Sequence, residues 1–273
     1  MKNLNLTGKV IIAGAGPGDP ELISVKAVRL LKTADIVLTD RLVSPEILQE
    51  YVPSHAEIIY VGKQGRSGLS TPQGRINQML VDYARSGKTV VRLKGGDISL
   101  FSNILDELQV LLEHGIPYEL VPGISAAAGA AAYTGIPLTA RNYSKSVRFV
   151  TAHTNEKFPQ EYWKDLATTE DTLVFYMSTE ELVDVVQNLK ANSISADKFV
   201  AVVEQATTRL QNVSVSNIYS CLEDFSKLVF TTPSLLIIGK VVALYEQFAW
   251  LRNSKSGEQY FEPLENEYKK KAV

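Results

Sequence analysis

At 273 residues, with 45% hydrophobic and 21% charged residues, the chain has an ordinary globular composition and is long enough for two compact domains. Its net charge of −2 lacks the basic excess that binding to nucleic-acid phosphates demands, so we expect no nucleic-acid partner. The single cysteine cannot form an internal disulfide, and the first apolar run is too short for a secretory or membrane-spanning segment. These features favour a cytoplasmic protein with no membrane partner.

The first half of the chain alternates short β-branched runs with apolar residues at helical spacing. Strands are predicted at residues 10–13, 36–38, 58–61, 90–93 and 118–121, and a helix of small residues at 125–133. Strands that alternate with helices predict a largely parallel sheet covered on both faces. Polar or glycine-rich loops follow four of these strands, at residues 14–20, 39–44, 62–70 and 94–103. Because open parallel sheets bind ligands beyond the carboxyl ends of their strands, we expect these loops to share one functional edge.

A second domain is predicted beyond the breaker-rich segment 135–138. Its strand candidates are residues 147–150, 173–176, 199–203 and 235–238, and residues 211–216 alternate like an exposed antiparallel strand. The predicted fold class is therefore α/β, with two α/β domains, a mostly parallel N-terminal sheet and a mixed C-terminal sheet. The predicted boundaries are 1–138 for the first domain, 139–252 for the second, and 253–273 for a charged tail.

The glycine loop Gly-Ala-Gly-Pro-Gly-Asp at residues 14–19 does not match a dinucleotide-binding loop. Its G-x-G-x-G spacing lacks the third glycine of the G-x-G-x-x-G fingerprint. Pro17 supplies no N–H, and Asp19 places a negative charge where a phosphate would lie. Asp40, at the end of the second strand, keeps open a weaker NAD alternative as a ribose-binding carboxylate, and a tight turn without any ligand is a further alternative. A second glycine loop, at residues 94–97, favours a cleft in which backbone approaches a ligand closely.

Nine ordered segments carry a resemblance to a known family: GAGPGDPELIS (14–24), ADIVLTDRLVSPEIL (34–48), YVGK (60–63), VVRLKGGD (90–97), GIPYELVPGISAAAG (115–129), GIPL (135–138), SVRFVTAH (146–153), TLVFYMS (172–178) and SLLIIGKVV (234–242). Through them the chain resembles the uroporphyrinogen-III C-methyltransferases of the tetrapyrrole methylase superfamily. The resemblance implies a homodimer of two-domain subunits with the methyl donor, S-adenosylmethionine, in the cleft between the domains. It also implies two methyl transfers that convert uroporphyrinogen III through precorrin-1 to precorrin-2, for sirohaem or cobalamin synthesis, with S-adenosylhomocysteine as the other product.

The resemblance also implies roles for individual residues. Asp40 and Lys63 match the positions of the proton acceptor and the proton donor, which suits a reaction in which the macrocycle must lose a proton. The implied donor-binding residues are Pro17, Gly95, Gly96, Asp97, Leu100, Ser125, Ala126, Met177 and Ala206. Without the resemblance, Asp40 would be a strand-end cap and Lys63 a solvated lysine. Met177 and Leu100 would then be core residues.

Departures from the family pattern gather in loops expected to face the tetrapyrrole. Asn103 stands where the family has an arginine, Ala140 stands where it has a histidine, and the segment after Lys63 lacks the family's arginine and histidine. Ala206 stands where a glycine is common. The remaining candidates to bind substrate carboxylates, each also readable as an ordinary surface cation, are Lys63, Arg41, Arg66, Arg141 and Arg148.

Two other functions stay open at this point: methylation of a later corrin precursor or of another acceptor, and non-catalytic binding of a tetrapyrrole or of the donor. The histidines, His55, His114 and His153, have no metal-ligand spacing, so we expect no metal site. Trp163 and Trp250 are interpreted as packing residues.

Overall fold

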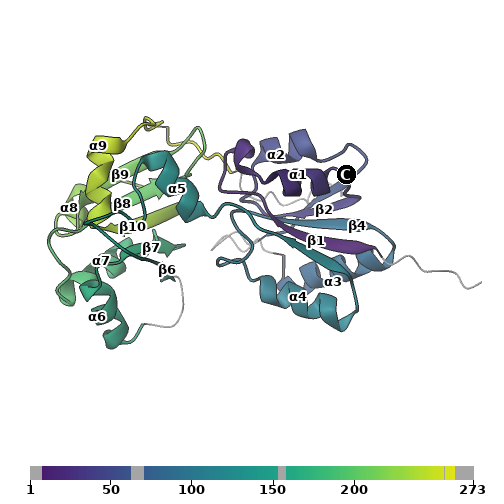
Figure 1. Ribbon diagram of the computed structural model, residues 1–273, viewed down its shortest axis with the longest axis horizontal. Helices are drawn as coiled ribbons and strands as arrows, with labels where there is room; N and C mark the ends of the chain where they lie inside the picture. Colours follow the sequence, from purple (N-terminus) through teal and green to yellow (C-terminus); the bar gives the residue numbers. More distant parts are fainter. Residues whose placement is uncertain (1–7, 63–70, 153–157, 255, 262–273) are drawn as a thin grey trace, which may run out of the picture. The chain divides into compact units, whose positions relative to one another are not determined.

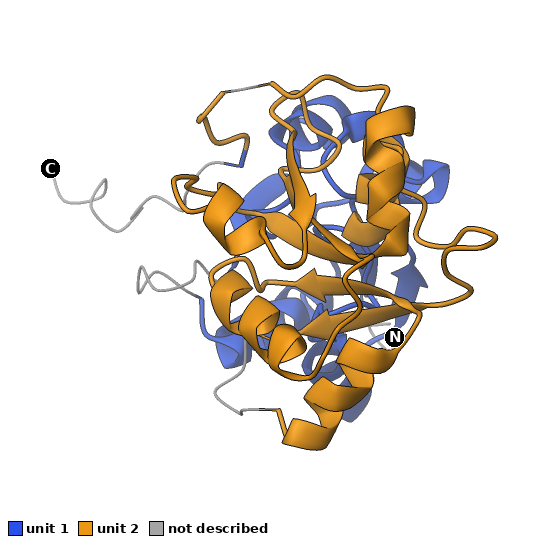
Figure 2. Ribbon diagram, turned by 90° about the vertical axis from the view of Figure 1, so that its left-hand side faces the viewer, with its two compact units in different colours: residues 1–125, 261–273 blue, residues 126–260 orange. Residues whose placement is uncertain are grey.

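The computed structural model describes residues 8–62, 71–152, 158–254 and 256–261, and the chain divides into two compact units (Figures 1 and 2). Unit 1 comprises residues 1–125 and 261–273, and unit 2 comprises residues 126–260. No helix in the described ranges is long and apolar enough to cross a membrane.

Unit 1 is built on a five-stranded sheet whose strands are all parallel, as the sequence predicts, and whose order is β3-β2-β4-β1-β5. Its strands are β1 (Lys9–Gly14), β2 (Ile36–Thr39), β3 (Glu57–Tyr60), β4 (Thr89–Lys94) and β5 (Tyr118–Val121). Its helices are the 3-10 turn η1 (Pro20–Leu22) and the α-helices α1 (Val25–Leu31), α2 (Pro45–Tyr51), α3 (Gln73–Arg85) and α4 (Ile104–Glu113).

The central strand β4 shows how the two faces of this sheet are covered. Successive side chains of a strand point to opposite faces. Val91 and Leu93 pack in the apolar cluster formed with α1 and α2, and Val90 packs in the cluster formed with α3 and α4. Arg92 and Lys94 share the face of Val90, so two cations lie beneath α4.

Unit 2 contains a mixed five-stranded sheet in the order β6-β7-β10-β8-β9. Its strands are β6 (Val147–Thr151), β7 (Thr172–Tyr176), β8 (Phe199–Glu204), β9 (Asn212–Asn217) and β10 (Ser234–Gly239). Strand β6 pairs with β7 in parallel, and the other pairs are antiparallel, including the predicted edge strand β9. Because β10 runs antiparallel to both β7 and β8, the carboxyl ends of β7 and β8 lie at the same edge of the sheet.

Helices cover both faces of the second sheet. The helices α6 (Gln160–Thr168), α7 (Leu182–Ala191) and α8 (Cys221–Asp224) pack on one face, where Trp163 is buried as a packing residue. The helix α5 (Ala126–Thr134) and the 3-10 turn η2 (Lys240–Leu244) pack on the other face, and the short helix α9 (Tyr245–Phe248) follows η2. Trp250 is exposed, but its ring contacts Tyr133 edge-on and its Nε1 donates to Ala132 O at 2.8 Å.

The observed division differs from the expected boundary at residue 138. It falls between Ser125 and Ala126, because α5 packs Ala127 and Ala130 against the core of the second sheet. The breaker segment 135–138 therefore lies inside unit 2 and does not link two domains.

Part of the charged tail expected from residue 253 is hydrogen-bonded to unit 2 in the described structure. The side-chain amide of Asn253 bonds to both N and O of Val213 on β9, at 2.9 Å each. The backbone N–H of Tyr260 donates to Gln205 Oε1 at 2.6 Å, and both Tyr260 and Phe261 are buried. The charged composition of this segment does not predict these hydrogen bonds. Residues 262–273 lie outside the described ranges.

Candidate functional site

The two glycine loops of unit 1 lie against each other at the carboxyl edge of the sheet, as expected. Gly16 and Gly96 form an antiparallel bridge in which each N–H donates to the carbonyl of the other, at 3.1 and 2.7 Å. Their φ angles of +84° and +68° are left-handed, a conformation that glycine adopts at little cost. Pro17 follows this bridge directly, so the loop after β1 is held in place by the loop after β4.

Close backbone packing explains other glycines at this edge. A Cβ on Gly14 would lie 2.6 Å from Gly96 O, and one on Gly123 would lie 2.2 Å from the same oxygen. A Cβ on Gly95 would lie 2.8 Å from Leu42 O, in the loop after β2. The glycines therefore let the loops after β1, β2, β4 and β5 meet, whether or not a ligand also approaches them.

Asp97 holds the loop after β4 to the loop after β5. Its Oδ1 accepts hydrogen bonds from the N–H and the hydroxyl of Ser99, and its Oδ2 accepts one from Gly123 N at 2.9 Å. Burial opposes ionisation of Asp97, but these hydrogen bonds outweigh it and lower the pKa of the carboxyl. A negative charge is thus fixed beside the Gly16–Gly96 bridge. Gly123, which donates to this carboxylate, lies two residues before Ser125. Leu100, further along this loop, is half-buried.

The loop after β1 lacks the geometry of a pyrophosphate site, which supports rejection of the NAD alternative. It leads into η1, where the carboxylate of Asp19 accepts from Glu21 N at 2.9 Å. The next α-helix, α1, begins only at Val25 and is capped by Ser24. The loop therefore does not open onto the α-helix N-terminus that a dinucleotide site uses.

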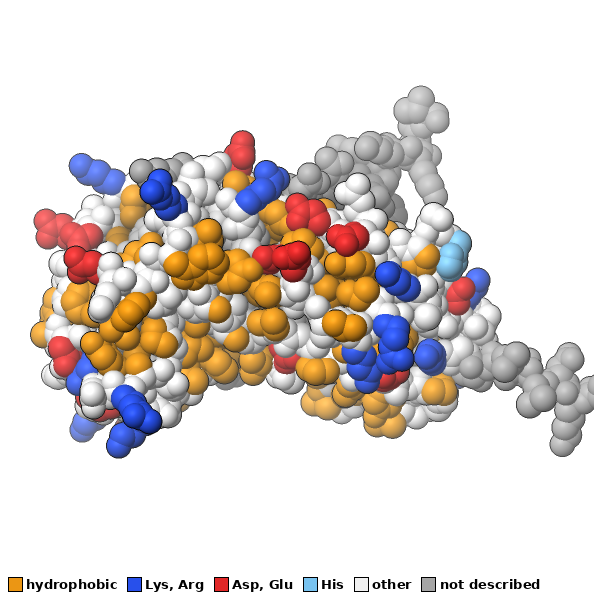
Figure 3. Space-filling view, turned by 45° about the horizontal axis from the view of Figure 1, so that its top comes forward, with side chains coloured by type: hydrophobic (Ala, Val, Ile, Leu, Met, Phe, Trp, Pro, Cys, Tyr) orange, Lys and Arg blue, Asp and Glu red, His pale blue; other side chains and the backbone are white. Residues whose placement is uncertain are grey.

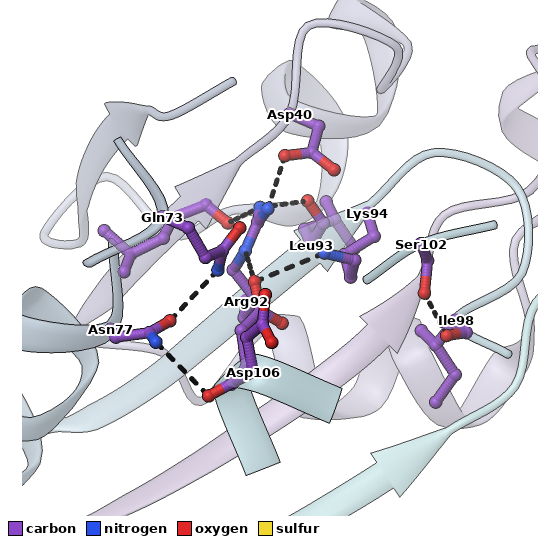
Figure 4. Close-up of polar contacts among 11 residues, drawn as sticks. Asp40, Gln73, Asn77, Arg92, Leu93, Lys94, Ile98, Ser102 and Asp106 are labelled. Carbon is purple, nitrogen blue, oxygen red and sulfur yellow. Dashed lines mark hydrogen bonds and ion pairs between the residues drawn. The ribbon is translucent and has the colours of Figure 1, made fainter. Parts of the chain in front are cut away.

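Asp40, the predicted proton acceptor, lies at the end of β2 near Arg92 and Lys94 (Figure 4). Glu107 completes this charged cluster through ion pairs with both cations. Its Oδ1 is 2.5 Å from Arg92 Nη2. Arg92 Nε donates to Glu107 Oε1 at 3.0 Å, and Lys94 Nζ lies 3.2 Å from the same oxygen. The side chains of Glu107, Arg92 and Lys94 are 0%, 3% and 5% exposed, whereas that of Asp40 is 25% exposed.

Electrostatics differ between the two cations of this cluster. Burial of Arg92 opposes its charge, but Asp40 and Glu107 outweigh that effect and raise its pKa. Burial of Lys94, reinforced by the charge of Arg92, lowers its pKa despite the two carboxylates. Sequence patterns alone did not indicate Arg92, Lys94 or Glu107 as site residues. The available signal was the pair of cations at alternate positions of an otherwise apolar strand.

Arg41 lies next to Asp40 and is half-buried. Its Nη1 donates to Phe261 O at 3.4 Å, and its buried Nε has no hydrogen-bond partner in the described part of the chain. Burial lowers the pKa of Arg41. The other residues expected near this edge, Lys63 and Arg66, lie outside the described residues.

Unit 2 brings three of the expected donor-binding residues to one sheet edge. Met177 follows β7 with φ +54° and is 53% exposed, and Ala206 follows β8. Ala126 begins α5, whose Ala127 N–H donates to the hydroxyl of Tyr176 at 3.0 Å. Ala126 and Ala206 also pack in the same apolar cluster. The remaining expected donor-binding residues belong to unit 1.

The expected substrate cations of unit 2 lie in different surroundings. Arg141 is exposed in a turn closed by the Ala140–Ser144 bridge, where its charge faces solvent. Arg148, near the amino end of β6, bonds to Asp165 and, at 2.5 Å, to Asp171. The structure therefore gives Arg148 carboxylate partners of its own and does not bring it to the edge of Met177.

Asn103, which stands in place of the family's arginine, is exposed at the N-cap of α4 with φ +53°. Asparagine is one of the few residues other than glycine that adopt this conformation readily. Within the described ranges, no three His, Cys, Asp or Glu side chains are grouped as metal ligands.

The sequence profile described as Tetrapyrrole (Corrin/Porphyrin) Methylases matches residues 9–221. The siroheme synthase of Acinetobacter baylyi is 47% identical over 244 residues, which cover 89% of this chain and 53% of that protein. The chain thus spans about half the length of the curated relatives that it matches.

Solved structures of methyltransferases also resemble this chain. A uroporphyrin III C-methyl transferase from Thermus thermophilus is 34% identical, with a TM-score of 0.73 over 87% of this chain and 100% of that chain. A structure of the Thermus thermophilus enzyme with S-adenyl homocysteine has a TM-score of 0.72 over 87% of this chain and 94% of that chain, at 34% identity. A cobalt precorrin-4 methyltransferase is 27% identical, with a TM-score of 0.76 over 86% and 95% of the two chains. The predicted resemblance is confirmed, and the chain belongs to the tetrapyrrole (corrin/porphyrin) methylase family.

Proposed function

We propose that the chain is an S-adenosylmethionine-dependent uroporphyrinogen-III C-methyltransferase that forms precorrin-2 through precorrin-1. The observation that carries the proposal is the carboxyl edge of unit 1, where an ion-paired Asp40 and the half-buried Arg41 lie at the end of β2, next to the bridged glycine loops of β1 and β4. The similarity to the Thermus thermophilus enzyme over that enzyme's full length supports the same activity. The chain spans about half the length of the siroheme synthases, and our proposal concerns the methyl transfers.

The residues at the two sheet edges have the chemistry that the methyl donor requires. Bound S-adenosylmethionine would supply an electrophilic methyl group carried on a sulfonium. The fixed negative charge of Asp97 would favour its ammonium group, and the Gly95-Gly96 backbone would face its methionine part. We propose Pro17, Leu100 and Ser125 as further donor-binding residues of unit 1. For unit 2 we propose Ala126, Met177 and Ala206.

Asp40 and Arg41 would act on the tetrapyrrole. After the new carbon–carbon bond forms, the macrocycle must lose a proton, and the partly exposed carboxylate of Asp40 would accept it. The Nε of Arg41 has no hydrogen-bond partner among the described residues, and a substrate carboxylate would satisfy it with a charge-assisted hydrogen bond. We also propose Lys63 as the proton donor, and Arg66 and Arg141 as further carboxylate-binding cations.

A mass spectrum of the tetrapyrrole tests this function. Purified protein is incubated anaerobically with uroporphyrinogen III and excess S-adenosylmethionine, and an Asp40→Asn sample serves as the control. The expected products carry first one and then two added methyl groups, with two molecules of S-adenosylhomocysteine formed per precorrin-2. Donor binding without methylation of uroporphyrinogen III would contradict the substrate assignment.

A methylase of a later corrin precursor is the second candidate, because Asn103 replaces the family's arginine and the fold also matches a cobalt precorrin-4 methyltransferase. Methylation of a corrin precursor, but not of uroporphyrinogen III, in the same assay would favour it.

We further propose a cytoplasmic homodimer. Exposed apolar side chains such as Phe248 and Trp250 support self-association, and apolar side chains form patches on the face in Figure 3. Light scattering on a sizing column would test the dimer.

A further inference from the structure

A chain of buried charges leads from α4 to the carboxylate of Asp40. Glu107 on α4 accepts from Arg92 Nε. Arg92 Nη2 donates to Asp40 Oδ1 (Figure 4). Arg92 lies on β4 and Glu107 on α4, whereas Asp40 directly follows β2, and the contacts join residues 52 and 15 positions apart in the sequence. The exposed fraction of their side chains rises from 0% at Glu107 to 3% at Arg92 and 25% at Asp40. The chain of contacts therefore begins in the core and ends at the surface where Asp40 meets solvent.

The guanidinium of Arg92 is held in one orientation. Besides its bonds to Glu107 and Asp40, its Nη1 donates to the carbonyls of Leu38, at 3.3 Å, and Leu93, at 3.2 Å. Because all three nitrogens of this planar guanidinium donate to acceptors, the group cannot rotate without breaking hydrogen bonds inside the protein. Arg92 thus fixes the position of Asp40 Oδ1, and a lysine at this position could not reproduce the set of contacts.

Glu107 does more than balance charge. Its Oε1 is shared by Arg92 Nε and Lys94 Nζ, which holds both cations of β4 against α4. Lys94 lies directly before the Gly95-Gly96 loop, and Leu38 lies two residues before Asp40. One carboxylate in the core is therefore linked both to the strand end that carries Asp40 and to the strand end that carries the glycine loop.

We propose that Arg92 is a positioning residue for Asp40, that Glu107 holds Arg92 in place, and that this arrangement directs Asp40 Oδ2 toward the substrate for proton transfer. This inference rests on the proposed function, in which Asp40 accepts the proton. A displacement of about 1 Å in a catalytic group is enough to lower a rate by roughly a hundredfold. Loss of Arg92 should therefore lower turnover through Asp40, with little effect on donor binding.

A double-mutant cycle tests the proposal. Arg92→Gln and Asp40→Asn are made singly and together, and kcat, the KM for uroporphyrinogen III and the donor Kd are measured for each. We expect Arg92→Gln to lower kcat by about 10- to 100-fold and to change the donor Kd by less than about threefold. The double variant should turn over no more slowly than Asp40→Asn alone, because Arg92 acts through that carboxylate. Losses that multiply would overturn the proposal.

Matched variants separate positioning from general destabilisation. Glu119→Gln removes a surface carboxylate paired with Lys26 at 2.7 Å on the same unit, and it should leave kcat unchanged. Arg92→Lys keeps the positive charge but lacks the planar guanidinium, and it should lower kcat as Arg92→Gln does. If the Arg92→Gln variant does not fold, Arg92→Lys takes its place in the cycle. Full activity of a folded Arg92→Lys would contradict the positioning role.

A structural measurement keeps this inference distinct from the proposed function. Crystal structures of the wild type and of Arg92→Lys should show the carboxylate of Asp40 displaced or rotated in the variant. If the wild type does not methylate uroporphyrinogen III, the proposed substrate is wrong, and the position of Asp40 in these structures still decides whether Arg92 fixes it. An unmoved Asp40 would refute the inference.

Discussion

Replacement of Glu107 by glutamine removes the carboxylate that Arg92 and Lys94 share inside unit 1. The two cations lie 3.0 and 3.2 Å from Glu107 Oε1 and are almost fully buried. Removing one member of a buried ion pair costs about 3–5 kcal/mol, because it leaves an uncompensated charge in a low-dielectric interior. The exposed pair of Lys26 and Glu119 is shorter, at 2.7 Å, yet exposed pairs contribute only about 0–1 kcal/mol. Glu107→Gln should therefore lower the free energy of unfolding of unit 1 far more than Glu119→Gln does.

The assay must report on unit 1. Both tryptophans of the chain, Trp163 and Trp250, lie in unit 2, so tryptophan fluorescence would follow the wrong unit. Hydrogen exchange of peptides that cover β4 and α4 measures the opening of unit 1 directly. A loss of 3–5 kcal/mol corresponds to roughly a hundred- to several-thousand-fold faster exchange. Equal protection in Glu107→Gln and Glu119→Gln would refute the assignment of a buried, paired Glu107.

The pH dependence supplies a second check. Burial, and then the charge of Arg92, lower the pKa of Lys94 below the ordinary value of 10.5. Between the lowered pKa and 10.5 the unfolded state binds more protons than the folded state, so the stability contribution of this group rises with pH through that window. Glu107 raises the pKa of Lys94, so its loss lowers that pKa further and widens the window. The cost of Glu107→Gln should therefore shrink as pH rises from neutral toward the ordinary pKa of lysine, and a cost that grows with pH would contradict this account.

Three further predictions concern ligand binding and turnover. Asp40→Asn should lower kcat by at least about tenfold while the donor Kd measured by calorimetry changes little, because a general base contributes typically 10²–10⁴-fold; unchanged turnover would make Asp40 a structural residue. Gly96→Ala should weaken donor binding, because φ is +68° at this position and the substitution strains the loop, whereas Gly74→Ala, with open space around its Cβ, should bind the donor normally. Equal calorimetric affinities of these two variants would place the donor elsewhere. Arg141→Ala should raise the KM for uroporphyrinogen III by roughly tenfold or more and leave donor affinity intact, since a charged hydrogen bond contributes about 1.5–3 kcal/mol. An unchanged KM would show that Arg141 is an ordinary surface cation and does not bind the substrate.

Local sequence determined the order and type of most elements. Alternation of β-branched runs with helical periodicity predicts the parallel sheet of unit 1, and strict alternation near residue 212 predicts the edge strand β9. Both signals depend on which face of a single element is buried, and that information is contained within a few neighbouring residues. The edge that carries the loops follows from the parallel direction of the strands, so the sequence alone predicts that Asp40 and the glycine loops lie at one edge.

Only the tertiary structure decided which charges meet. Asp40, Arg92 and Glu107 come from separate elements, and their contact depends on the strand order β2-β4-β1, which sequence periodicity does not contain. The same is true of Asn253 and Tyr260, in a segment whose composition suggested a charged tail. The side-chain amide of Asn253 bonds to the backbone of Val213, and the backbone N–H of Tyr260 donates to the side chain of Gln205. Hydrogen bonds and ion pairs between distant segments depend on three-dimensional proximity, whereas helices and strands report their own burial pattern. That difference is why the fold could be predicted from the sequence and the support of Asp40 could not.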